Sequence, residues 1–136
     1  MRRVFADSSY WIALLNPRDE LHVKARGAAR TYASDRVVTS EMVLVEFLNA
    51  FSDRGPRLRR AAAQAIRSLQ SAASVVVIPQ TSDQFEQALR RYDGRPDKSW
   101  SLTDCASFLI METERIDSAL TYDQHFAQAG FQALLR

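Results

Sequence analysis

Four acidic residues stand at places in the chain where a carboxylate needs an explanation. Asp7 ends a short apolar run, and Glu46 lies inside the apolar segment MVLVEFLNAF. Asp104 comes directly before another apolar stretch, and Asp123 follows a short β-like run. Carboxylates that gather in one crevice repel one another unless a cation neutralises them, and oxygen ligands alone suit Mg²⁺ or Mn²⁺. A site of this kind would hydrolyse phosphodiesters.

Each acid also has an ordinary structural explanation. Asp7, Asp104 and Asp123 all stand where a strand or loop meets a helix, and an aspartate at such a place caps the helix. Asp104 follows Ser101 at the spacing of a capping box. Glu46 could form a structural ion pair with a nearby arginine. The acids make a functional site only if they meet in space.

The composition limits which metal could bind. The 136 residues include one cysteine, Cys105, and two histidines, His22 and His125. These numbers exclude an internal disulfide and a zinc site built from thiolates and imidazoles, so we expect any metal to be held by oxygen. The length fits a single domain over residues 1–136. Without a signal peptide or an apolar run of ~20 residues, the protein is expected to be cytoplasmic and free of membrane partners.

The elements that must position the acids alternate between short β-rich runs and longer amphipathic segments. This alternation is typical of an α/β protein whose parallel sheet is covered by helices. The expected strands are Arg3 to Ala6, Arg36 to Thr39, Val75 to Ile78, Ser118 to Leu120 and Gln132 to Leu135. The expected helices are Ser9 to Leu15, Leu21 to Ala33, Glu41 to Phe51, Leu58 to Ser71, Ser82 to Tyr92, Thr103 to Thr113 and Gln124 to Ala129.

A parallel sheet would bring the acids to one edge. The carboxyl ends of its strands face one crevice, and Asp7, Asp104 and Asp123 would share it. Glu46 can reach the same edge from the helix that follows the second strand. The sequence therefore predicts an Mg²⁺ or Mn²⁺ site that positions water for attack on a phosphodiester.

The formal net charge is only +2, but arginines gather in two stretches. The planar guanidinium group suits phosphate, although a solvated helix face is the more usual explanation for such arginines taken alone. The candidates for contact with a nucleic-acid backbone are Arg54, Arg57, Arg59, Arg60, Arg90, Arg91 and Arg95.

The four acids, in this order and spacing, resemble the motifs of the PIN-domain ribonucleases, and specifically of the VapC toxins. VFADSSYWIALL is similar to the first motif and TSEMVLVEFLNAF to the second, while SLTDCASFLIM and ALTYDQHFAQAGF are similar to the third and fourth. The resemblance covers essentially the whole chain. It makes Asp7, Glu46, Asp104 and Asp123 the metal ligands.

The resemblance implies a small five-stranded parallel sheet between helices and an Mg²⁺- or Mn²⁺-dependent endoribonuclease. It also implies a homodimer, a VapB-type antitoxin that blocks the acidic crevice, and a structured RNA such as tRNA as substrate. Ser8, Ser101 and Thr121 would orient ligands or water by hydrogen bonds, and the arginines would hold the RNA backbone.

Two alternatives stay open at this point. One is a PIN scaffold that binds RNA or protein without cleaving it, and the other is a structure-specific DNA nuclease. Glu41 and Asp97 also stand near the motifs, where each could either support a metal site or cap a helix.

Overall fold

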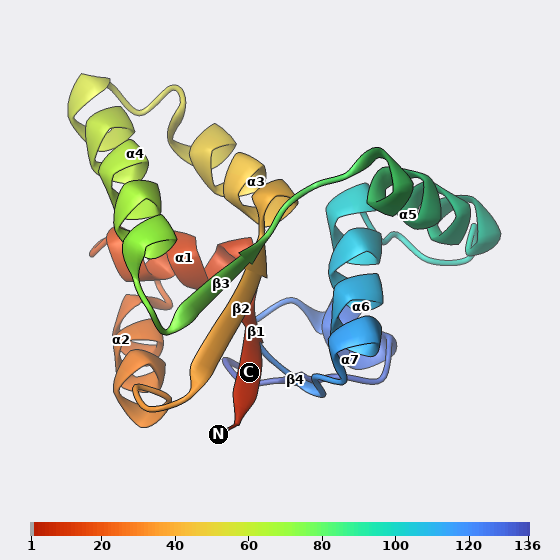
Figure 1. The fold of residues 1–136 in the computed structure, drawn as a ribbon. Helices are drawn as coiled ribbons and strands as arrows, with labels where there is room; N and C mark the ends of the chain where they lie inside the picture. The colour runs from red at the N-terminus through yellow and green to blue at the C-terminus, as the bar shows by residue number, and fades with distance from the viewer. Residues whose placement is uncertain (1) are drawn as a thin grey trace.

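The computed structural model describes residues 2–136 and consists of one five-stranded sheet with helices on both faces (Figure 1). The strands are β1 (Arg3–Ala6), β2 (Arg36–Ser40), β3 (Val75–Ile78), β4 (Ser118–Leu120) and β5 (Gln132–Ala133). The helices are α1 (Ser8–Leu15), α2 (His22–Thr31), α3 (Glu41–Phe51), α4 (Pro56–Ser71), α5 (Ser82–Gly94), α6 (Leu102–Glu114) and α7 (Gln124–Gln128). Every predicted strand and helix is present, with ends shifted by at most two residues.

The sheet is parallel throughout, in the order β3-β2-β1-β4-β5, which confirms the predicted fold class. In the register of the two central strands, Ala6 lies opposite Leu120. The backbone N–H of Asp7 continues this pairing by donating to the carbonyl of Leu120 at 3.2 Å. The residues that follow β1 and β4 are therefore held side by side at one edge of the sheet.

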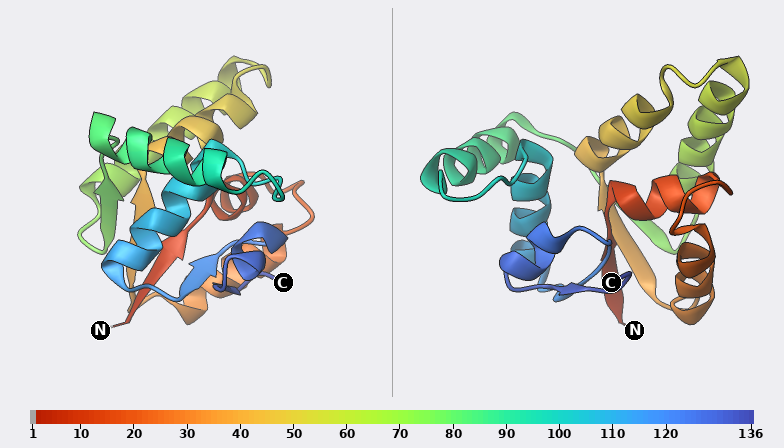
Figure 2. Two further views of the ribbon diagram at one scale, coloured as in Figure 1. Left: turned by 90° about the vertical axis from the view of Figure 1, so that its right-hand side faces the viewer. Right: turned by 180° about the vertical axis from the view of Figure 1, so that it is seen from behind.

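The helices form two layers (Figures 1 and 2). Helices α1, α2 and α4 cover one face of the sheet, and α5, α6 and α7 cover the other. Helix α3 begins at the carboxyl end of β2 and contacts both α1 and α6. It thus lies above the edge where β1 and β4 end.

The buried side chains that fix the second layer are mainly aromatic. Phe108 of α6 packs edge-on against Phe126 of α7, with ring centroids 5.0 Å apart, and Phe126 in turn lies 6.4 Å from Phe5 of β1. All three side chains are fully buried. This packing holds the first turns of α6 and α7 near the end of β1.

Strand β2 passes into α3 without a loop. Ser40 is the last residue of the strand and also caps the helix, because its hydroxyl accepts from the N–H of Val43 at 3.1 Å. The strand was predicted to end one residue earlier, at Thr39. Helix α4 begins at Pro56 rather than at Leu58, because a proline fits the first helical position. None of the helices within residues 2–136 combines the length and apolar character needed to cross a bilayer.

Candidate active site

Asp7 lies at the acidic edge, directly after β1, and is only 4% exposed. It stands at the N-cap position of α1, yet its side chain makes no capping hydrogen bond. Instead its Oδ2 accepts from the hydroxyl of Thr121 at 2.8 Å and from that of Ser9 at 3.3 Å. For Asp7, helix capping therefore does not explain the carboxylate.

Glu46 reaches the same edge from α3, as predicted. Its Oε1 accepts a hydrogen bond from the hydroxyl of Ser8, the residue after Asp7. The glutamate is half-buried, and burial raises its pKa, opposed by the bond from Ser8 and reinforced by the charges of Asp104 and Asp123. The carboxylate on α3 thus faces acids that come from other elements.

Asp104 serves as a helix cap and as a site residue at once. Its Oδ2 accepts from the backbone N–H of Ser101 at 3.0 Å, and its own N–H donates to the Ser101 hydroxyl at 3.0 Å, which completes the predicted capping box. The same Oδ2 lies 3.0 Å from Nδ1 of His125. Asp104 is 7% exposed, so the carboxylate that starts α6 is also buried among the other acids.

Asp123 completes the cluster from the start of α7. Its Oδ1 caps the helix by accepting from the N–H of His125 at 2.9 Å, and it lies 3.2 Å from Nδ1 of the same residue. Its backbone N–H donates to Thr121 Oγ1 at 3.0 Å. Thr121 therefore connects Asp123 to Asp7.

The electrostatics of the edge favour a bound cation. Burial raises the pKa of Asp7 to about 7, with further increases from the charges of Glu46 and Asp104. Burial and the charge of Asp123 raise the pKa of Asp104 as well. Within residues 2–136, no lysine or arginine forms an ion pair with any of the four acids. Negative charge is concentrated here without a permanent positive partner.

The donor set fits a divalent cation. Asp104 and Asp123 each hold one carboxylate oxygen in hydrogen bonds, while the other oxygen accepts no hydrogen bond from the residues that the structure describes. One fixed oxygen orients the second, which is what a preorganised ligand requires. The ring of His125 also lies beside Asp104 and Asp123, so an imidazole stands next to the carboxylate oxygens expected as ligands.

The three hydrogen-bonding residues predicted from the sequence all contact acids of the cluster. Ser8 donates to Glu46, Ser101 forms the capping box with Asp104, and Thr121 donates to Asp7. Two further contacts were missed, those of Ser9 and His125. A serine two residues after Asp7 and a histidine two residues after Asp123 are weak signals in a sequence, since only the fold turns them toward the acids.

The predicted arginines divide into two groups. Arg91 forms a two-pronged pair with Glu112 at 2.8 and 2.9 Å, and Arg95 pairs with Asp97 at 3.0 Å. Arg90 lies 3.9 Å from Glu86, and Arg59 donates to the carbonyl of Ser52 at 2.7 Å. The remaining predicted arginines have exposed side chains and form no ion pair within residues 2–136: Arg54, Arg57 and Arg60.

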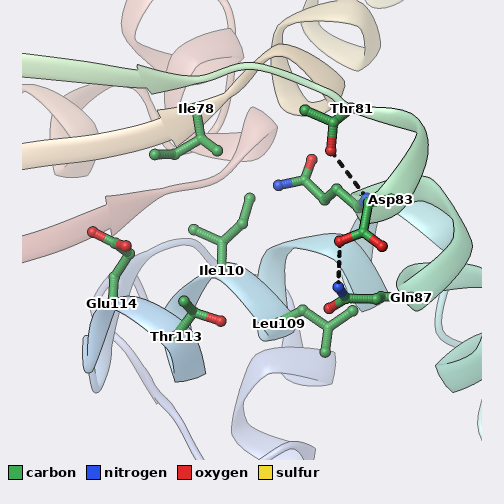
Figure 3. A pocket seen from close by; sticks show the side chains of 9 residues that line it. Ile78, Thr81, Asp83, Gln87, Leu109, Ile110, Thr113 and Glu114 are labelled. Carbon is green, nitrogen blue, oxygen red and sulfur yellow. Dashed lines mark hydrogen bonds between the residues drawn. The ribbon is translucent and has the colours of Figure 1, made fainter.

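The two acids whose roles the sequence left open form their hydrogen bonds away from the acidic edge. Glu41 accepts from the backbone N–H of Gln80 at 2.8 Å, and Asp97 is the partner of Arg95. A hollow between β3, α5 and α6 is likewise separate from the acidic edge (Figure 3). Its acid Asp83 accepts from Gln87 at 2.8 Å, as the figure shows. None of these acids adds to the site.

Comparison with known proteins identifies the class. The model of the PIN domain family matches residues 4–132, and the chain belongs to this family. It is 34% identical over 130 residues to the 23S rRNA-specific endonuclease VapC20 of Mycobacterium tuberculosis, recorded for strains CDC 1551 / Oshkosh and ATCC 25618 / H37Rv, covering 94% of this chain and 95% of the relative.

A solved structure gives the same result. The crystal structure of Mycobacterium tuberculosis VapC20, described as a Sarcin-Ricin loop cleaving toxin, matches with a TM-score of 0.80 and 36% identity. The match covers 94% of this chain and 95% of that one. The predicted likeness to the VapC ribonuclease toxins is confirmed.

Proposed function

We propose that residues 1–136 act as a single PIN domain that hydrolyses RNA with the help of Mg²⁺ or Mn²⁺. The observation that carries this proposal is Asp7, a buried carboxylate that accepts from the hydroxyls of Thr121 and Ser9 and lies near the charges of Glu46 and Asp104. The ligands of the cation would be Asp7, Glu46, Asp104 and Asp123. When bound, the cation would stabilise negative charge on the phosphate under attack and make water more acidic.

The chain's own residues would prepare the site before substrate arrives. Hydroxyl groups of Thr121 and Ser8 hold the carboxylates of Asp7 and Glu46 in place. Because these donors come from β-strand ends and helix starts that are buried, the ligands are fixed without a conformational change. Preorganised ligands cost little reorganisation during the reaction.

We propose the sarcin–ricin loop of 23S rRNA as the substrate. The names of the relatives support this choice over tRNA, since the likeness extends over 94% of the chain. The exposed arginines at the α3–α4 turn, Arg54, Arg57 and Arg60, would contact the RNA backbone through phosphate. RNA affinity should then fall as salt rises.

The partners would be a VapB-type antitoxin and a second copy of the chain, in the cytoplasm. Exposed apolar side chains on neighbouring helices, Val45 of α3 and Phe85 of α5, line one hollow and support a homodimer. The acidic edge would attract a basic antitoxin segment. Such a segment would compete with the RNA for the same crevice.

The test is cleavage of four substrates by the purified full chain, with Mn²⁺ or with EDTA. The substrates are a synthetic sarcin–ricin stem-loop, pooled tRNA, a scrambled stem-loop, and DNA of the sarcin–ricin sequence. The variants Asp7→Asn and Asp104→Asn keep size and remove charge. We expect cleavage of the sarcin–ricin RNA alone, by the wild type alone, and only with Mn²⁺.

The other outcomes select between the alternatives. Cleavage of tRNA but not of the stem-loop would make tRNA the substrate in place of the sarcin–ricin loop. Cleavage of the DNA would favour a structure-specific DNA nuclease. If the wild type binds RNA but leaves every substrate intact with Mn²⁺, the chain is a non-catalytic scaffold. Cleavage in EDTA at the rate seen with Mn²⁺ would refute the metal dependence.

A further inference from the structure

His125 is placed between two acids of the site that come from different helices. Its Nδ1 lies 3.0 Å from Asp104 Oδ2 and 3.2 Å from Asp123 Oδ1. The side chain is 20% exposed, so the contact is largely shielded from water. Within residues 2–136 it is the one basic side chain that comes within ion-pair distance of any of the four acids.

The other ring nitrogen of His125 also has a polar neighbour. The hydroxyl of exposed Ser99 lies 3.3 Å from Nε2 of His125. When Ser99 donates to Nε2, the proton of the neutral ring resides on Nδ1, which then donates to Asp104 Oδ2 and faces Asp123 Oδ1. The resulting chain of hydrogen bonds runs from Ser99 through His125 to Asp104.

The two carboxylates differ in how firmly the rest of the fold holds them. Asp104 is fixed by the capping box at the start of α6. Asp123 precedes a helix of five residues, α7, and its Oδ1 accepts only from His125. The imidazole therefore links the less constrained acid to the firmly held one. The ring forms a hydrogen bond with Asp104 Oδ2 and lies 3.2 Å from Asp123 Oδ1, so Asp104 Oδ1 and Asp123 Oδ2 remain for a ligand.

We propose that His125 is a positioning residue that holds Asp104 and Asp123 in the geometry needed to bind the divalent cation. This inference rests on the proposed function. The ring acts as a hydrogen-bond donor from Nδ1 and is not itself a metal ligand. Groups that orient metal ligands in this way typically change metal affinity by 10- to 100-fold when they are removed.

The test compares His125→Asn with His125→Ala in the full chain. The amide nitrogen of asparagine can take the place of Nδ1 and still donate, while alanine removes the donor. Mn²⁺ affinity is measured without RNA, by electron paramagnetic resonance of the free ion, and thermal melting checks that each variant is folded. The matched control is His22→Asn, because His22 contacts the carbonyl of Ala13 at 2.7 Å and no acid of the site.

We expect His125→Ala to weaken Mn²⁺ binding by at least tenfold, His125→Asn to stay within about threefold of the wild type, and the His22 control to match the wild type. Ser99→Ala, which disturbs only the exposed end of the hydrogen-bond chain, should weaken binding a few-fold. In cleavage of the sarcin–ricin stem-loop, kcat should fall for His125→Ala while KM for RNA stays constant.

Three results would overturn the proposal. If His125→Ala binds Mn²⁺ with wild-type affinity, His125 has no positioning role. If His125→Asn binds Mn²⁺ as weakly as His125→Ala, the ring is a direct ligand or a packing element. A wild type that binds no Mn²⁺ would refute the proposal together with the metal site. If the wild type binds Mn²⁺ but cleaves no RNA, the proposed ribonuclease activity fails while the affinities still decide the role of His125.

Discussion

Thr121 Oγ1 donates to Asp7 Oδ2 at 2.8 Å, although the two residues are 114 positions apart in the chain. The same oxygen accepts the backbone N–H of Asp123 at 3.0 Å. One fully buried hydroxyl therefore supports two acids of the site, from the end of β1 and from the start of α7. The parallel pairing of β1 with β4 makes this contact possible.

Replacing Thr121 with valine should weaken the site while keeping its shape. Loss of the hydroxyl removes the shorter of two hydroxyl hydrogen bonds to the Asp7 carboxylate and the acceptor for the N–H of Asp123, which is then left without a partner. We expect a loss of about 1–3 kcal/mol in the free energy of unfolding and weaker Mn²⁺ binding. Urea denaturation and Mn²⁺ titration measure the two effects.

Thr39→Val is the matched control for this variant. The Thr39 hydroxyl is equally buried, but it contacts Trp11 Nε1 at 3.1 Å and the carbonyl of Ala6 at 2.9 Å. Its loss should lower stability and leave Mn²⁺ affinity unchanged. Equal effects of both valines on Mn²⁺ affinity would show that Thr121 has no particular role at the site.

Mn²⁺ should stabilise the folded chain. The four acids meet only in the native state, so the cation should bind that state. At a Mn²⁺ concentration one hundred times the dissociation constant, the free energy of unfolding should rise by about 2.7 kcal/mol. The midpoint of thermal unfolding should rise by several degrees, as differential scanning fluorimetry would record. Asp7→Asn should abolish most of this increase. An equal rise in that variant would locate the cation elsewhere.

The stability of the metal-free protein should fall as pH rises. Asp7 has a pKa of about 7 when folded, against 3.8 when unfolded, so the folded state binds the proton more tightly. This contribution is fully present below pH 4 and is lost as pH rises through 7. In EDTA, the wild-type free energy of unfolding measured by urea denaturation should be lower at pH 8 than at pH 5, by an amount on the order of a few kcal/mol.

Asp7→Asn is the control for this pH dependence, because asparagine does not titrate. Its stability should change less between pH 5 and pH 8, and above pH 7 it should exceed that of the wild type in EDTA. If both proteins show the same pH profile, Asp7 is ionised throughout the range and burial has not raised its pKa.

The arginines should differ in their effect on RNA affinity. Arg57→Ala and Arg60→Ala remove exposed, unpaired charges, so each should weaken binding and reduce the slope of affinity against salt by about one. Arg91→Ala breaks the pair with Glu112 and should change stability rather than that slope. Fluorescence anisotropy between 50 and 200 mM salt measures these effects. Arg30→Ala, on α2, serves as the control.

The sequence predicted the elements well, and it placed the four candidate acids along them, because both depend on local patterns. Short β-rich runs, helix caps and apolar periodicity place three of the acids where a strand or loop meets a helix, and Glu46 inside the helix that follows β2. Capping, the alternative explanation, is correct for Asp104 and Asp123, whose side chains do cap α6 and α7. It is wrong for Asp7, whose side chain makes no capping hydrogen bond and accepts from the Thr121 hydroxyl instead.

The sequence could not predict contacts that depend on packing between distant elements. His125 reaches Asp104 only because α6 and α7 pack together through Phe108 and Phe126. The engagement of Arg91 with Glu112 likewise depends on how α5 lies against α6. The spacing of residues in the sequence does not predict such contacts, because the fold alone brings the two side chains together in space.

Because β2 passes directly into α3, insertions into the chain are restricted at this place. Five residues separate Ser40, which caps the helix, from Glu46, and each residue added to a helix rotates the side chains beyond it by about 100°. An insertion between them would turn the glutamate away from the other acids, while the helix itself could remain intact. Insertions should be tolerated at the exposed turn around Gly55, which connects α3 to α4 beyond the glutamate. Helix geometry therefore fixes the number of residues between Ser40 and Glu46, but it does not fix which side chains those residues carry.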